Sequence, residues 1–143
     1  MKSKHLIADI PCKAFIKRDN KVLFVLEDDG IWSLPGGRMH EGEMPRESLK
    51  REIYEELGVD VDVGDPIDCT VFTSKSGVAH FVVAFEADIF PGQDLVPDQH
   101  DIAAIEWVEI TEILKRNMHV GSRLIVERLA KKEKTPQGRN LEG

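Results

Sequence analysis

Three glutamates spaced for one edge of a helix carry the strongest chemical signal in the sequence. Glu52, Glu55 and Glu56 lie in the stretch 44–57, whose periodicity predicts a helix. At about 100° per residue, their three carboxylates fall within an arc of roughly 100°. Like charges at this spacing repel by about a few tenths of a kcal/mol per pair. The arrangement makes physical sense around a divalent cation, because hard oxygen ligands suit Mg²⁺ or Mn²⁺.

The alternative interpretation is a solvated acidic helix face, which is the usual meaning of an isolated acidic cluster. The residues around the glutamates argue against it. Gly37, Glu43 and Arg51 precede them at fixed spacings, and Gly58 follows. At roughly one in 15 per position, a chance match of all these residue types is on the order of 10⁻⁸ per starting point. We therefore interpret the pattern as a functional motif.

Residues 37–59, GRMHEGEMPRESLKREIYEELGV, resemble the Nudix box, G-x5-E-x7-R-E-U-x-E-E-x-G-U, where U is a bulky aliphatic residue. Every position matches, with Ile53 and Val59 as the two aliphatic residues. The preceding segment 32–37, WSLPGG, is similar to the usual lead-in of the MutT-like branch. The resemblance implies an α/β fold, namely a Nudix α/β/α sandwich with a mixed β-sheet and a loop-helix-loop box. It also implies hydrolysis of a nucleoside diphosphate linked to another group, with Mg²⁺ or Mn²⁺.

Roles for individual residues follow from the resemblance. It implies four metal ligands: the carbonyl of Gly37 and the carboxylates of Glu52, Glu55 and Glu56. Gly37 is otherwise a simple turn glycine. Glu43 and Arg51 correspond to the ion pair that braces the loop against the helix, which is a supporting role and not a catalytic one.

Hydrolysis of a pyrophosphate link needs charge neutralisation, in-line geometry and a water made nucleophilic by a base. In the family, this base is a box glutamate, here Glu52 or Glu55, or an acidic residue on a downstream loop. Asp101 lies six residues before Trp107, close to where such a loop carboxylate is expected. The alternative is an ordinary turn residue.

The histidines offer weaker candidates. His100 stands beside Asp101 and could shuttle a proton, and His40 could contact a phosphate. Exposed loop histidines usually have no such role. His5, His80 and His119 have no supporting context.

The resemblance narrows the substrate only in part. The proline that marks many ADP-ribose hydrolases after the box is absent, because Lys75 stands there. The tyrosine that marks diadenosine-polyphosphate hydrolases is missing too, since Tyr54 is the only tyrosine. No coenzyme A motif is recognisable. We expect hydrolysis of an ordinary or damaged (d)NTP to NMP and PPi, with a base stacking on one of four aromatics: Phe15, Trp32, Phe72 or Phe81.

Other functions remain as alternatives. ADP-ribose or a nucleotide sugar is the runner-up substrate class, followed by a prenyl or inositol diphosphate. A non-catalytic nucleotide-sensing module is disfavoured, because such proteins commonly lose box carboxylates and here all are present.

The composition limits the number of domains, the binding partners and the compartment that we expect for this protein. The 143 residues, 41% of them hydrophobic, fit one domain with one core. A net charge of −7 argues against binding to a nucleic-acid polymer or an anionic membrane. No apolar run approaches the roughly 18 residues of a membrane-spanning helix, so we expect a cytoplasmic protein. Cys12 and Cys69 are interpreted as buried thiols of a reducing compartment. Family resemblance also raises a homodimer, although no stretch identifies an interface.

The elements that must position the site can be placed along one domain, residues 1–132, with a flexible tail at 133–143. A strand pair at 6–17 and 22–26 is expected to form a hairpin. A second hairpin joins 59–73 to 78–90 through Lys75–Gly77, with Pro66 at a bulge or an edge. A strand at 103–109 and helices at 111–117 and 120–132 follow, with Thr111 as an N-cap and Val120, Leu124 and Leu129 on the apolar side.

The box helix should begin with Pro45 in its first turn and end at Gly58 in a left-handed cap. Met44, at the N-cap position, has no capping oxygen, which should weaken the helix start by about 1 kcal/mol. Leu49, Ile53 and Leu57 form an apolar stripe beside the three glutamates. The helix would therefore pack one edge on the core and present the next edge to the metal.

Overall fold

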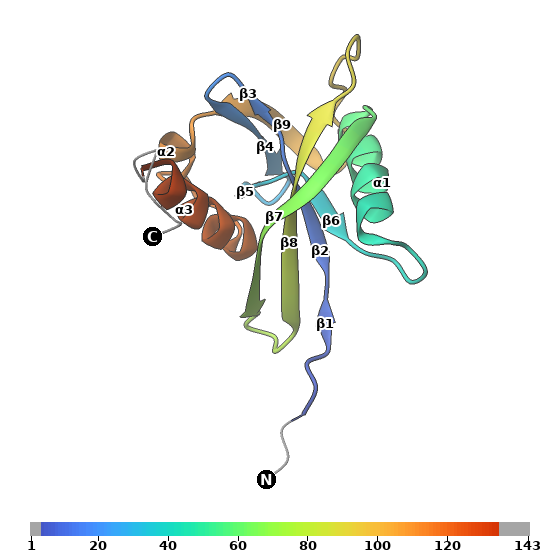
Figure 1. Cartoon of the computed structure of the whole chain (residues 1–143), viewed down its shortest axis with the longest axis vertical. Helices are drawn as coiled ribbons and strands as arrows, with labels where there is room; N and C mark the ends of the chain where they lie inside the picture. Colours follow the sequence, from blue (N-terminus) through green and yellow to red (C-terminus); the bar gives the residue numbers. More distant parts are fainter. Residues whose placement is uncertain (1–3, 135–143) are drawn as a thin grey trace, which may run out of the picture.

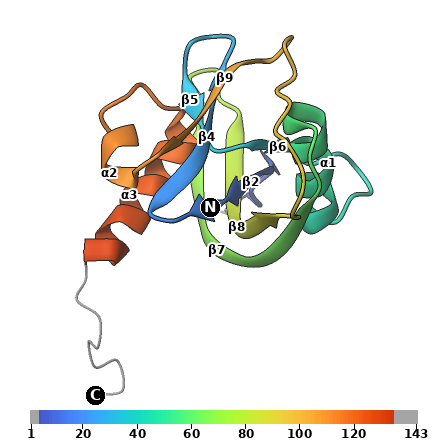
Figure 2. The same cartoon turned by 90° about the horizontal axis from the view of Figure 1, so that it is seen from above.

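The computed structural model describes residues 4–134, which form two β-sheets flanked by helices (Figure 1). Helix α1 covers one side and helices α2 and α3 the other, as the view from above also shows (Figure 2). This is the expected α/β/α sandwich. The elements are β1 (Ala8–Asp9), β2 (Pro11–Phe15), β3 (Lys17–Arg18), β4 (Lys21–Glu27), β5 (Trp32–Ser33), β6 (Gly36–Arg38), α1 (Pro45–Leu57), β7 (Val61–Thr73), β8 (Ala79–Ile89), β9 (Ile102–Val108), α2 (Ile110–Ile113) and α3 (Val120–Lys134).

The larger sheet is mixed, and it holds the lead-in to the box. Strand β8 pairs antiparallel with β7 on one side and parallel with β1 and β2 on the other. Strand β6 pairs antiparallel with β2, with Cys12 opposite Gly37. Because Gly37 is a sheet residue, the chain enters the box loop from a fixed position.

The smaller sheet is antiparallel and is built on β4. Strands β3 and β5 pair with β4, and β9 lies along most of its length. The pairing of β4 with β9 therefore brings residues 21–27 beside residues 102–108, which are far away in the sequence.

The first predicted hairpin was only partly right. Lys17–Arg18 pairs with Lys21–Val22 across a tight turn in which Asp19 adopts a φ of 57°. The preceding residues, Pro11–Phe15, belong instead to the larger sheet. The chain changes sheets at Ile16, a buried residue, and the alternating pattern of the segment does not reveal this change of partner.

The second predicted hairpin is confirmed. Strands β7 and β8 are joined by residues 74–78, where Ser74 donates its N–H to the Val78 carbonyl and Gly77 has a φ of 88°. The register shifts on both sides of Pro66, so the proline marks a bulge as expected.

The C-terminal helices differ from the prediction in detail. Helix α2 is a short turn capped at Glu109, so Thr111 is not the N-cap. Val120, expected on the apolar side of α3, is 53% exposed, whereas Ile125 and Val126 are fully buried. Helix α3 includes residues 133 and 134, which were expected in the tail, and residues 135–143 lie outside the described residues. Within residues 4–134, no helix has the length and apolar character needed to cross a membrane.

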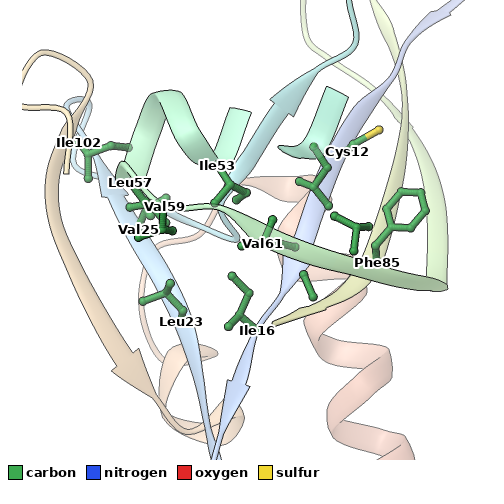
Figure 3. Packing of buried hydrophobic residues seen from close by; sticks show 14 residues of the cluster. Cys12, Ile16, Leu23, Val25, Ile53, Leu57, Val59, Val61, Phe85 and Ile102 are labelled. Carbon is green, nitrogen blue, oxygen red and sulfur yellow. The ribbon is translucent and has the colours of Figure 1, made fainter. Parts of the chain in front are cut away.

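Two hydrophobic clusters anchor the helices. One joins α1 to the sheets through Leu49, Ile53 and Leu57 (Figure 3). The other joins α3 to the opposite side through Ile125, Val126 and Leu129, among others. Burial of these side chains holds the box helix rigidly against the sheet that carries Gly37.

The two cysteines have different environments. Cys12 is buried in the first cluster, and burial raises the pKa of its thiol to about 11. Cys69 is exposed on β7, which corrects the expectation that both thiols are buried. Cys69 pairs with Val83, beyond Val61 and Val63, the buried residues that β7 contributes to the first cluster.

Candidate active site

The ends of α1 explain how the box helix is held. Met44 occupies the N-cap and its side chain makes no capping bond, but Glu47 accepts a hydrogen bond from the Met44 N–H at 3.1 Å. This hydrogen bond offsets part of the expected loss at the helix start. Gly58 closes the helix in the left-handed region, with a φ of 67°, and donates its N–H to Tyr54. The predicted helix and its cap are therefore confirmed.

Arg51 lies at the centre of the box carboxylates. Its Nε and Nη2 donate to Glu43, and Nη2 also donates to the Arg38 carbonyl at 3.2 Å. Its Nη1 lies 3.0 Å from Glu52 Oε1 and 2.9 Å from Glu55 Oε2. Hydrogen bonds from Arg51 hold the pKa of Glu43 down to about 2. The sequence-predicted pair of Glu43 and Arg51 is thus present, and the same guanidinium orients two of the predicted metal ligands.

Strand β6 contacts the other face of the glutamates. Gly36 donates its N–H to Glu56 Oε1 at 2.9 Å. Burial raises the pKa of Glu56 to about 7, although Lys13 and this hydrogen bond act in the opposite direction. Gly37 lies directly against Glu52, because a Cβ at position 37 would stand 2.6 Å from Glu52 Oε2. The backbone of residues 36 and 37 is therefore packed onto two of the three predicted ligands.

The donor set fits a divalent metal. The predicted side-chain ligands are all carboxylates, and Mg²⁺ keeps several waters, so it needs few protein ligands. Within residues 4–134, no three His, Cys, Asp or Glu side chains already converge as a complete metal site. The glutamates instead line an edge, with Glu52 and Glu55 held on Arg51 and Glu56 held on Gly36. Such an edge could share a metal with substrate phosphates.

Asp101 lies in the turn that enters β9, and it is exposed. The loop before it is tied to the end of α1, since Val96 donates to the Leu57 carbonyl and Asp98 to the Glu56 carbonyl, both at 2.8 Å. This loop therefore lies against the helix that carries the glutamates. No hydrogen bond or ion pair within residues 4–134 joins the Asp101 side chain to them. His100 and His40 are also exposed, and their hydrogen bonds are made by backbone atoms.

A cleft of about 230 Å³ opens beside Gly36 and Gly37. Sequence reasoning missed most of its walls. Its lining residues are Pro11, Lys13, Glu27, Ser33, Gly36, Gly37, Arg38, Phe72, His80, Val82, His119, Gly121 and Ser122. They come from β2, β4, β5, β6, β7, β8 and α3, so no local sequence signal could have assembled them.

Phe72 is the one of the four aromatics proposed for base stacking that lines this cleft. It is stacked on His80, with ring centroids 4.8 Å apart and an interplanar angle of 19°. Both side chains stand on the β7–β8 hairpin, which explains how His80, without context in the sequence, joins the site. Their neighbour Gly121 allows close packing of α3, because a Cβ there would stand 2.8 Å from Val82 Cγ2.

His119 lies between two carboxylates at another wall of the cleft. Its Nε2 is 3.2 Å from Glu27 Oε2 and 3.4 Å from Asp29 Oδ2, without hydrogen-bond alignment to either. Contact with Glu27 raises the pKa of His119, and the same contact lowers the pKa of Glu27. The imidazole therefore links the end of β4 to the start of α3.

Comparison with known proteins agrees with this architecture. The family model described as NUDIX domain matches residues 13–129, from the first strand of the cleft to the last turns of α3. The chain belongs to the NUDIX family. The Nudix box resemblance, the MutT-like character and the α/β/α fold expected from the sequence are thereby confirmed.

Two of the Nudix proteins similar to this chain are named for a substrate, and the two substrates differ. The CTP pyrophosphohydrolase of Escherichia coli K12 is 28% identical over 107 residues, which cover 71% of this chain and 76% of that protein. The MutT protein of Methanosarcina mazei Go1 has a TM-score of 0.78 at 22% identity, covering 93% of this chain and 100% of that one. A UDP-X diphosphatase has a TM-score of 0.74 at 22% identity, and the match covers 90% of this chain and 62% of that one.

Family membership makes this chain a Nudix pyrophosphohydrolase that acts on nucleotide derivatives. Nudix hydrolases generally use divalent metals, in accord with the carboxylate edge of α1. The expected enzyme class is thus confirmed.

Proposed function

We propose that the protein hydrolyses a nucleoside triphosphate, ordinary or damaged, to a nucleoside monophosphate and pyrophosphate. One water is added across the bond between the α- and β-phosphates. The observation that carries this proposal is the cleft beside Gly36 and Gly37, which adjoins the carboxylate edge of α1. A nucleoside in the cleft would direct its phosphates toward that edge.

The size of the cleft supports a mononucleotide. Pockets that enclose drug-sized ligands hold roughly 300–1,000 Å³, whereas this cleft has about 230 Å³. It suits one nucleoside, and any group beyond the nucleoside would extend out of the cleft. The E. coli relative named as a CTP pyrophosphohydrolase is consistent with such a substrate.

The box residues would divide the work. Mg²⁺ or Mn²⁺, when bound, neutralises phosphate charge and lowers the pKa of water. Arg51 orients Glu52 and Glu55, while Glu43 holds Arg51 in place. Asp101 would accept a proton from the attacking water, with Glu52 or Glu55 as the alternative base. We assign the metal to four ligands: Gly37 through its carbonyl, Glu52, Glu55 and Glu56.

A nucleotide sugar or ADP-ribose is the second candidate substrate. The fold is shared with a UDP-X diphosphatase, which favours this alternative over the non-nucleotide substrates. A nucleotide-sensing module without activity is disfavoured, because all box carboxylates are retained. We also infer a cytoplasmic enzyme from its two free cysteines and its acidic charge. A homodimer remains part of the proposal by family resemblance.

A product screen tests the reaction directly. Purified protein with Mg²⁺ would be given ordinary and oxidised (d)NTPs, ADP-ribose, nucleotide sugars and dinucleotide polyphosphates. We expect NMP and PPi from a triphosphate, loss of turnover in EDTA, and recovery with Mg²⁺ or Mn²⁺. Turnover of ADP-ribose or a sugar conjugate alone would transfer the assignment to the second candidate. Hydrolysis that persists in EDTA would overturn the metal mechanism.

A further inference from the structure

Lys13 is the cleft residue that stands between the nucleoside walls and the box. It lies on β2, and its Nζ donates to the Gly36 carbonyl at 3.3 Å and to Ser33 Oγ at 3.2 Å. Gly36 in turn donates its N–H to Glu56. Lys13 is therefore separated from a predicted metal ligand by one residue of the lead-in loop.

The hydrogen-bonding capacity of Lys13 is not exhausted. An ammonium group has three N–H donors and no acceptor, and Gly36 and Ser33 take two of them. The side chain is only partly buried and lines the cleft. One donor thus remains for a group inside the cleft.

An anionic substrate in the cleft needs a cationic group near Gly36, because carboxylates lie close to this point. Glu27 lines the same cleft and Glu56 accepts the Gly36 N–H, so two carboxylates lie near Lys13. The chain carries a net charge of −7, so an anionic substrate approaches against the field of the whole protein. The other strong cation of the lining, Arg38, is exposed and paired with Asp9.

We propose that Lys13 binds a non-bridging oxygen of the phosphate attached to the nucleoside. This inference rests on the proposed placement of a nucleoside in the cleft, with its phosphates directed to the α1 edge. The chain of phosphates must then pass Gly36 and Gly37, where Lys13 presents its remaining donor. Every nucleoside diphosphate derivative has this phosphate, so the contact is independent of the base and of the leaving group.

Binding without metal isolates this contact. AMP, CMP, GMP and UMP and the matching nucleosides would be titrated in EDTA against wild type and Lys13→Gln by calorimetry. We expect the best NMP to bind wild type more tightly than its nucleoside. Lys13→Gln should weaken that NMP by about 10-fold to 100-fold, as for loss of a hydrogen bond to a charged group. Affinity for the nucleoside should stay within about 2-fold, since it lacks the phosphate.

Two further variants separate binding from support of the loop. Lys13→Arg keeps a cation and should recover most of the NMP affinity. Lys17→Gln removes the same charge from exposed strand β3, where Lys17 pairs with Glu133, and should leave both affinities unchanged. Equal weakening of NMP and nucleoside by Lys13→Gln would make Lys13 a structural brace. Equal binding of both ligands to wild type would also overturn the proposal.

Turnover distinguishes this inference from the proposed reaction. The value of kcat/KM should fall by a similar factor in Lys13→Gln for every base tested. If wild type hydrolyses only a nucleotide sugar and Lys13→Gln still loses NMP affinity, the triphosphate assignment fails and the role of Lys13 stands. If wild type hydrolyses triphosphates and Lys13→Gln behaves as wild type, the role of Lys13 fails alone.

Discussion

Gly37 and Glu52 are packed so closely that position 37 has no room for a side chain. A Cβ there would stand 2.6 Å from both Cδ and Oε2 of Glu52. The two residues come from different elements, β6 and α1, which meet only because α1 is buried against the sheets. Glycine at position 37 therefore serves the placement of a carboxylate 15 residues away.

Replacing Gly37 with alanine should disturb that carboxylate. We expect Gly37→Ala to fold and to lose at least about 10-fold in kcat, because misplacement by about 1 Å can cost up to about 100-fold. Gly64→Ala is the matched control, since its Cβ would meet its nearest neighbour at 3.5 Å, an ordinary contact. Steady-state kinetics with Mg²⁺ would compare the two. Wild-type kcat in a folded Gly37→Ala variant would contradict the tight packing.

Removing the charge of Glu55 tests the metal edge. Glu55 is the most exposed of the three glutamates, and its carboxylate pairs with Arg51. We expect Glu55→Gln to retain the wild-type melting temperature and to lose at least about 100-fold in turnover, because a metal ligand is lost. Glu41→Gln, on the exposed box loop, serves as a control of equal charge. Near-normal turnover of Glu55→Gln would remove Glu55 from the metal site.

Glu56 should make the stability of the metal-free protein depend on pH. Its pKa is raised from 4.5 to about 7, so the folded state binds a proton that the unfolded state has released. The contribution of Glu56 to the free energy of unfolding should therefore fall as pH rises from about 4.5 to about 7.

Thermal denaturation in EDTA measures this effect as the difference between wild type and Glu56→Gln, which cannot titrate. As pH rises through this window, the melting temperature of wild type should fall relative to that of Glu56→Gln. Mg²⁺ should reverse this relative loss by binding the carboxylate. A difference that stays constant from pH 4.5 to 7 would show that Glu56 does not titrate there.

The proposed role of Asp101 as general base can be tested by comparing the effects of a substitution on kcat and on KM. If Asp101 is the general base, Asp101→Asn should lower kcat by about 100-fold or more and change KM little, because the amide cannot accept the proton. Asp94→Asn, exposed on the same loop, should leave both parameters unchanged. An unchanged kcat in Asp101→Asn would make Asp101 an ordinary turn residue and leave the role of base to a box glutamate.

The contact of His119 with Glu27 and Asp29 predicts a second pH dependence. Because the pKa of His119 is raised, its stabilising contribution is complete below the unfolded pKa of about 6.5 and is lost as pH rises through the folded pKa. The pKa of Glu27 is lowered, so its contribution is present above about 4.5 and is lost in acid.

Both contributions are present between these limits, from about pH 4.5 to about pH 6.5. We expect His119→Gln to reduce the melting temperature more at pH 6 than at pH 9. The control His100→Gln, at an exposed loop residue, should leave the melting temperature unchanged at both pH values. NMR titration of the imidazole would report the raised pKa directly. An imidazole that titrates at or below about 6.5 would contradict the contact.

Short-range order along the chain was determined by the sequence alone. The box helix, its buried stripe and its three adjacent glutamates follow from a period of about 3.6 residues, and Gly58 follows from the need for a left-handed cap. The contact of Glu43 with Arg51 spans eight residues and came with the family motif. The β7–β8 hairpin and the bulge at Pro66 likewise depend on neighbouring residues.

Only the tertiary structure decided which distant segments meet. Alternation along residues 11–18 indicates strands, but it does not indicate that Pro11–Phe15 joins β8 while Lys17–Arg18 joins β4. Nothing in the segments around Lys13, Glu27 and His119 points to a site. They line one cleft because strand pairing and helix packing bring β2, β4 and α3 together. Such pairings are set by burial summed over the whole chain, which no local pattern contains.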